Sequence, residues 1–161
     1  MEAIVIQHGE AVDASVNPER PLSKKGQEQF LRLAQFLKII NWKPEIIIHS
    51  GILRAFESAA IVAETFNCEV AVNKSINPKD NPDAIIQYLL LEKRNIIVVT
   101  HKPFIDVLVA RVLSTNQTGL ITVTNASPIF LSSDGDMLYC KAYIPEMMID
   151  AIIRSFSNRQ S

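Results

Sequence analysis

The sequence predicts an α/β fold: a three-layer sandwich in which helices cover both faces of a mostly parallel sheet, with a hairpin near the C-terminus. Short apolar runs, typical of strands buried on both faces, alternate with longer segments whose apolar residues recur at helical spacing. This alternation indicates parallel strands joined by helices. The length of 161 residues fits a single domain spanning 1–161.

Local signals place each element along the chain. Ser23 is an N-cap for the first helix, Asn81-Pro82 precedes the third, and Pro103 opens the fourth. The predicted strands are 3–6, 46–48, 69–72 and 96–99. The predicted helices are 23–40, 53–66, one from 82, 103–113 and 146–156. Strands 128–131 and 137–143, joined through Asp134-Gly135, form the hairpin, and 157–161 is a loose tail.

Composition excludes several classes of function. Sixteen basic and seventeen acidic residues give a net charge of −1, which argues against nucleic acid or a membrane surface as the partner. The five glycines are too far apart for a dinucleotide fingerprint or a P-loop. The histidines and cysteines have no local zinc spacing.

The expected location is the cytoplasm. No apolar run approaches the ~20 residues of a membrane span, and Met1 leads directly into a short strand rather than a signal peptide. Two widely spaced cysteines are typical of buried thiols in a reducing compartment. The sequence leaves the oligomeric state open.

All three histidines follow predicted strands. They lie in Gln7-His8-Gly9-Glu10, in His49-Ser50-Gly51 and in Thr100-His101-Lys102. Ligands of parallel sheets bind outside the carboxyl ends of the strands. One such histidine alone is more often structural, but three at equivalent ends favour a functional site there.

The helices that follow two of these ends favour an anion as the ligand. The predicted helices from 53 and 103 would point their N-terminal amides and positive dipole ends into the same crevice. Arg54 lies in the first turn of one of them, where the helix dipole disfavours a cation, and this placement favours a functional role for Arg54. A guanidinium there can bind an oxyanion in bidentate fashion, so the crevice suits a phosphate-like group.

These residues resemble the ordered motifs of the histidine phosphatase superfamily, and the short chain is most similar to the SixA-like phosphohistidine phosphatases. The resemblance covers about residues 1–145. Its motifs here are Gln7-His8-Gly9-Glu10-Ala11, Arg20-Pro21-Leu22-Ser23 with Gly26, Ser50-Gly51-Ile52-Leu53-Arg54-Ala55, and Val99-Thr100-His101-Lys102-Pro103.

The resemblance implies three catalytic residues. His8 matches the histidine that attacks phosphorus, Arg54 a phosphate-binding arginine, and His101 the histidine that polarises the phosphoryl oxygens. Gln7 departs from the pattern because the family usually has another phosphate-binding arginine at this position. Arg20 and Lys102 are the candidates to restore that charge.

The residues predicted to bind the substrate, beside the catalytic three, are Gln7, Gly9, Arg20, Ser50 and Lys102. A histidine nucleophile has to be neutral, and nearby cations lower its pKa. Phosphoryl transfer then needs mainly positioning and charge stabilisation. A reaction through a histidine nucleophile would require neither a metal nor a cofactor, and we expect none. We expect His49 to be structural, because strand alternation places it opposite Ser50.

The predicted function is a phosphatase acting on a phosphorylated histidine-containing protein through a phosphohistidine intermediate at His8. Glu10, the carboxylate nearest to His8 in sequence, is expected to face loop or solvent, so no general acid is evident. Phosphohistidine makes less demand on such an acid than a sugar phosphate does. The alternatives are a binding module whose chemistry Gln7 has weakened and a general small-molecule phosphomonoesterase. A receiver-like signalling domain fits poorly, because receivers carry acidic residues at strand ends.

Overall fold

The computed structural model describes residues 2–159, and Met1 and residues 160–161 of the expected tail lie outside them. One six-stranded sheet has the order β3-β2-β4-β1-β5-β6. The strands are β1 Glu2–Gln7, β2 Ile46–His49, β3 Glu69–Val72, β4 Ile96–Thr100, β5 Ile129–Asp134 and β6 Met137–Tyr143. The helices are α1 Lys24–Ile39, α2 Leu53–Phe66, α3 Asp83–Leu91, α4 Phe104–Val112 and α5 Glu146–Ser157.

The first four strands are parallel, and the C-terminal hairpin adds two antiparallel strands at one side. In the pairing of β1 with β4, Gln7 lies beside Thr100, and in that of β2 with β4, His49 lies beside Val99. The strands β2, β4 and β1 are therefore neighbours in register, and their carboxyl ends lie side by side. The predicted mostly parallel α/β sandwich is confirmed.

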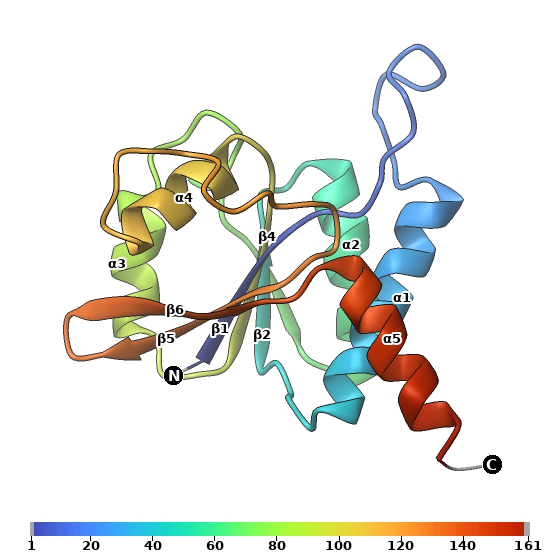
Figure 1. The fold of residues 1–161 in the computed structure, drawn as a ribbon. Coiled ribbons are helices and arrows are strands. Elements are labelled where there is room, and N and C mark those ends of the chain that lie inside the picture. The colour runs from blue at the N-terminus through green and yellow to red at the C-terminus, as the bar shows by residue number, and fades with distance from the viewer. Residues whose placement is uncertain (1, 160–161) are drawn as a thin grey trace.

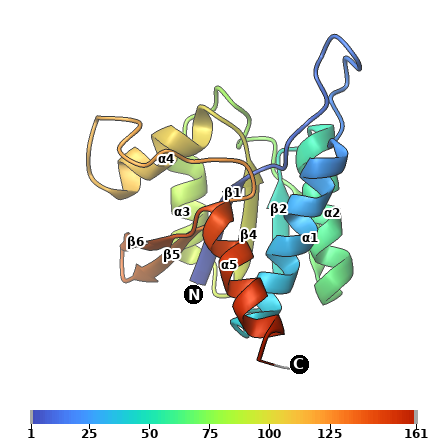
Figure 2. The same ribbon diagram turned by 45° about the vertical axis from the view of Figure 1, so that its right-hand side comes forward.

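Helices cover both faces of this sheet (Figures 1 and 2). Along β1, Ala3 and Val5 pack into the core shared with α3 and α4, whereas Ile4 and Ile6 pack into the core shared with α1, α2 and α5. This alternation explains why β1 is an unbroken apolar run: each face of the strand is buried against a different helical layer.

Most predicted boundaries differ from the observed ones by a residue or two. Ser23 caps α1, and its hydroxyl accepts a hydrogen bond from the Gly26 N–H at 3.1 Å. At α3 the proline is the cap rather than the first helical residue, and the Asn81 side chain accepts a hydrogen bond from the Asp83 N–H. Ser157, predicted to belong to the tail, is the last residue of α5, and β5 continues beyond its predicted end at 131 to Asp134.

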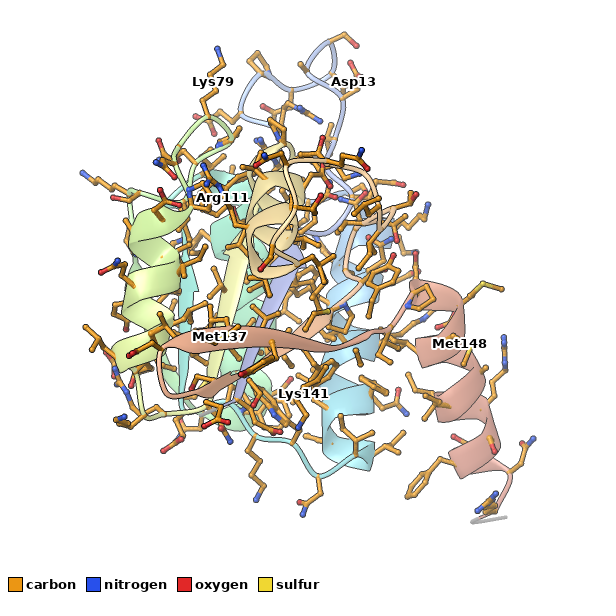
Figure 3. All side chains as sticks on the ribbon, turned by 60° about the vertical axis from the view of Figure 1, so that its left-hand side comes forward. Asp13, Lys79, Arg111, Met137, Lys141 and Met148 are labelled. Atoms are coloured by element: carbon orange, nitrogen blue, oxygen red, sulfur yellow. The ribbon has the colours of Figure 1, made fainter. Side chains whose placement is uncertain are left out.

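Two loops rise beyond the carboxyl ends of the parallel strands. Asp13 lies at the tip of one and Lys79 on the other, at the same end of the molecule (Figure 3). The base of the first loop is closed by a backbone bridge between Ala11 and Leu22 and by a 2.8 Å hydrogen bond from Val12 N–H to Pro21 O. Among residues 2–159, no helix is long and apolar enough to cross a membrane.

Candidate active site

The first residues after three adjacent strands meet at one edge of the sheet. These residues are Ser50 after β2, His101 after β4 and His8 after β1. The centres of the His8 and His101 rings are 4.9 Å apart, and the Ser50 hydroxyl lies 2.6 Å from His101 Nε2. Strand order therefore brings together residues that are far apart in the sequence, as parallel topology requires.

Both ring nitrogens of His8 have partners that define its tautomer. Nδ1 lies 2.7 Å from Gly9 O, and because a carbonyl can only accept, Nδ1 carries the proton. Nε2 therefore holds the lone pair, which accepts a hydrogen bond from Arg54 Nε–H at 2.9 Å. An anion that attracted the Arg54 guanidinium would free this lone pair from its hydrogen bond.

Burial keeps both rings neutral. Desolvation is the main cause that lowers the pKa of His8 to about 4, against a hydrogen bond to Gly9 that raises it, and the charges of Arg54 and Arg20 add to the lowering. Desolvation also lowers the pKa of His101 to about 3, with smaller contributions from His8 and Arg54. At neutral pH the site therefore contains two uncharged imidazoles beside cationic guanidinium groups.

Arg54 comes from the first turn of α2, whose N-terminus has no side-chain cap. Burial, followed by the charge of Arg20, lowers the pKa of Arg54, and a guanidinium still remains charged in a protein. α4, which follows His101, also begins without a side-chain cap. Uncapped helix N-termini leave amide donors for other partners, which agrees with the anion site expected from the sequence.

Arg20 is the sequence-predicted cation that the structure brings to this edge. Its charge acts on both His8 and Arg54, and its Nε–H donates to Val12 O at 3.3 Å from a backbone with φ of 51°. Lys102 instead has its ammonium 3.8 Å from the Asp106 carboxylate, so that carboxylate offsets part of its charge. Of the two candidates, Arg20 has the stronger electrostatic link to His8.

Gln7 ends β1 next to this site. Its backbone oxygen accepts a hydrogen bond from Ala126 N–H at 3.0 Å. Its side-chain Oε1 is buried and has no hydrogen-bond partner among the described residues. An unpaired buried oxygen carries a desolvation cost, so the position is not optimised for glutamine in this structure.

Two backbone supports near His8, from Asn125 and Ser58, were not singled out from the sequence. Asn125 Nδ2 donates to His8 O at 2.7 Å, and Ser58 Oγ accepts from Gly9 N–H at 3.1 Å. Gly26 packs so closely that a Cβ on Gly9 would lie 2.6 Å from Gly26 O. Of Asn125 and Ser58, only Ser58 had a signal in the sequence, since it lies one helical turn after Arg54. Gly9, expected among the substrate-binding residues, is thus required at least by packing.

Glu10 and His49 were both expected to have no catalytic role. Glu10 accepts from the Ser23 hydroxyl at 3.0 Å and pairs with Lys25 at 2.8 Å, and these contacts lower the pKa of its carboxyl. It is therefore an ionised loop residue, as expected. His49 is buried, and its Nδ1 accepts from Gly51 N–H at 3.1 Å.

Within residues 2–159, no group of three or more histidine, cysteine or acidic side chains is arranged to hold a metal ion.

The sequence itself matches a known family in its first half. Residues 4–78 match the model of the histidine phosphatase superfamily (branch 1). This segment includes His8, Arg20, Ser50 and Arg54. No curated protein matches the chain in sequence.

Solved structures share the fold over nearly the whole chain. A structure of the protein histidine phosphatase SixA complexed with tungstate is 21% identical, with a TM-score of 0.80 over 91% of this chain and 98% of that chain. A phosphoserine phosphatase from Entamoeba histolytica is 17% identical, with a TM-score of 0.73 over 92% and 98%. A mycobacterial glucosyl-3-phosphoglycerate phosphatase is also 17% identical, with a TM-score of 0.73 over 89% and 98%. These structures show that the fold is shared, and the family-model match over residues 4–78 confirms the resemblance to the histidine phosphatase superfamily in that segment.

Proposed function

We propose that this protein removes the phosphoryl group from phosphohistidine in another protein, through a covalent phosphohistidine intermediate at His8. The observation that carries the proposal is the hydrogen bond from His8 Nδ1–H to Gly9 O, since it leaves the Nε2 lone pair available beside Arg54 and His101. The match to the histidine phosphatase superfamily supports phosphatase chemistry in general.

In the first step, the Nε2 lone pair of His8 forms a bond to phosphorus while the P–N bond of the substrate breaks. The leaving imidazole takes the bonding electron pair and gains a proton from water. Arg54 leaves His8 Nε2 and binds the phosphoryl oxygens, together with His101 and the N-terminal amides of α2. Asn125 and Ser58 hold the oxygen and the nitrogen of the peptide group that joins His8 to Gly9, which fixes the line of attack.

In the second step, water attacks phosphorus and the P–N bond to His8 breaks. His8 keeps its Nδ1 proton throughout, so the phosphorylated ring is cationic and leaves as a neutral imidazole with the electron pair. Both protons of the attacking water remain on the product, which leaves as inorganic phosphate in its H2PO4⁻ form. Neither step needs a group that changes its oxidation state.

The carboxylate nearest to His8 in sequence favours a P–N bond over an alkyl P–O bond in the substrate. An alkoxide leaving group needs a general acid, but both oxygens of Glu10 already accept hydrogen bonds, one of them from Lys25. A leaving imidazole takes its proton from water readily. Among the solved neighbours, SixA is named a protein histidine phosphatase.

A small-molecule phosphomonoesterase is the second candidate, because similar structures are named as phosphatases of phosphoserine and of glucosyl-3-phosphoglycerate. The test is a substrate panel: a protein phosphorylated on histidine, free phosphoserine and a sugar phosphate, each with the natural protein and with His8→Ala. We expect phosphate release from the phosphohistidine protein to exceed that from the esters at least tenfold. Faster release from either ester would favour the phosphomonoesterase. Release from none above the His8→Ala background would leave the phospho-ligand-binding module.

A further inference from the structure

The hydrogen bond between Ser50 and His101 lies in the interior of the site. Ser50 Oγ and His101 Nε2 are 2.6 Å apart, and the two residues are 5% and 1% exposed. The other ring nitrogen, His101 Nδ1, is buried and has no hydrogen-bond partner among the described residues. A neutral imidazole carries its proton on one nitrogen only, so the direction of the Ser50 bond decides what Nδ1 offers.

A second hydrogen bond to Ser50 decides this direction. Ile52 N–H, which can only donate, lies 3.3 Å from Ser50 Oγ. If His101 Nε2–H also donated to Ser50, the hydroxyl proton would have no acceptor among residues 2–159 and His101 Nδ1 would be an unpaired acceptor. If Ser50 O–H donates to Nε2 instead, only the Nδ1–H remains unpaired. Each unpaired buried polar group costs about 1–3 kcal/mol, so the second arrangement is the more stable.

We propose that Ser50 is a positioning residue. Its hydroxyl donates a hydrogen bond to His101 Nε2, which keeps the ring proton of His101 on Nδ1 and makes Nδ1–H a donor to the transferring phosphoryl group. The proposal rests on the proposed function, in which one phosphoryl group contacts both rings. Ring centres 4.9 Å apart permit this contact. Ser50 was expected to bind substrate directly, and this assignment gives it an indirect role through His101.

The proton position matters because it decides between attraction and repulsion. With the proton on Nδ1, His101 donates to an anionic oxygen, but with the proton on Nε2 it would present a lone pair to that oxygen. Loss of one preorganised donor to a developing oxyanion costs roughly 10²–10³ in rate. A variant that populates both tautomers loses part of the rate that this donor contributes. We therefore expect phosphoenzyme formation in Ser50→Ala to slow by about 10- to 100-fold.

The direct measurement is ¹⁵N NMR of histidine-labelled protein at neutral pH, with the His101 signals assigned by their loss in His101→Gln. In the natural protein we expect Nδ1 to have the shift of a protonated ring nitrogen and Nε2 that of an unprotonated one. Ser50→Ala should mix the two forms, and Ser50→Thr, which keeps a hydroxyl, should restore the natural pattern. Added inorganic phosphate should shift the Nδ1 signal of the natural protein.

Thr100→Val is the matched control. Thr100, the last residue of β4, is also buried, but its hydroxyl donates to Ile76 O at 2.7 Å and has no hydrogen bond to the ring of His8 or His101 in the described part of the chain. The Thr100→Val substitution should lower thermal stability about as much as Ser50→Ala does, without changing the His101 tautomer. This separates an effect on the His101 proton from a general loss of packing.

Two results would overturn the proposal: a proton on Nε2 of His101 in the natural protein, or a tautomer that Ser50→Ala leaves unchanged. The predicted tautomer, its loss in Ser50→Ala and the phosphate-induced shift would support it. The NMR result does not depend on turnover. If the tautomer behaves as predicted but no phosphorylated substrate is hydrolysed, the proposed function fails while the assignment of Ser50 stands.

Discussion

The carboxyl ends of β1 and β4 differ from that of β2 by one residue. His8 and His101 are the first residues beyond their strands, whereas His49 is the last residue within its strand. His49 therefore packs in the helical layer, with its ring centre 5.4 Å from that of Phe56, while Ser50 occupies the place equivalent to the other two histidines. The environment of a strand-end residue therefore depends on whether it lies within the strand or just beyond it.

The largest expected effect comes from Arg54, which donates a hydrogen bond to the ring of His8. We expect Arg54→Ala to weaken vanadate or phosphate binding about 100-fold, because a bidentate charged contact is lost. Isothermal titration calorimetry would measure the affinity of each protein for the anion. Arg32→Ala, which removes a surface arginine paired with Asp150, is the control. Unchanged affinity in Arg54→Ala would place the anion elsewhere.

The second prediction compares the cations that could replace an arginine at position 7. Because the charge of Arg20 acts on His8 while Lys102 has an acidic neighbour, Arg20→Ala should slow phosphoenzyme formation about tenfold and Lys102→Ala much less. Gln7→Arg should tighten phosphate binding and speed phosphoenzyme formation by about tenfold, unless it meets the charge of Arg20. Rapid-quench measurement of the four proteins would separate these effects. If all three variants match the natural protein, position 7 is not a phosphate contact.

The third prediction concerns stability against pH. The folded protein keeps His8 and His101 neutral down to a pKa of about 4 and about 3, whereas the unfolded chain protonates both near 6.5. Between pH 6.5 and about 4 the unfolded state therefore binds more protons, and the free energy of unfolding falls as the pH falls. Urea unfolding at several pH values should show a shallower fall in His8→Asn and in His101→Asn. Identical slopes in all three proteins would contradict the burial of neutral rings.

The smallest expected effect on activity belongs to His49. His49→Leu removes the acceptor of Gly51 N–H and should lower the free energy of unfolding by about 1–2 kcal/mol. We expect kcat to change no more than about twofold, since His49 lies outside the ring pair. His49→Asn, which offers an oxygen to the same N–H, should recover most of the stability. A large loss of kcat with normal stability would assign His49 to the site.

Much of the fold could be predicted because local patterns determine it. The unbroken apolar runs at β1 and β4 reflect burial on both faces, and Ser23 marked the start of α1. The pair Asp134-Gly135 predicted the hairpin, whose turn consists of Gly135 and Asp136, and Gly135 has φ of 58°. In each case a few neighbouring residues contain the whole signal.

The site was only partly accessible from sequence. Strand-end positions brought His8, Arg54 and His101 to attention, but the bond from Asn125 to His8 O joins residues 117 positions apart. No local pattern encodes such a contact, because it depends on the loop that precedes β5. The direction of the Arg20 side chain likewise depends on the path of the 10–22 loop, and the role of Ser50 on the ring that β4 places beside it.

Attack of the His8 lone pair on phosphorus can be tested by trapping the phosphoenzyme. The protein would be incubated with a radiolabelled small phosphoramidate, quenched within the first turnover, and the label located by peptide mapping. We predict one label per chain on His8, stable in base and labile in acid, absent in His8→Ala and strongly reduced in Arg54→Ala. Phosphate release without a label on His8, or equal labelling in His8→Ala, would contradict the account.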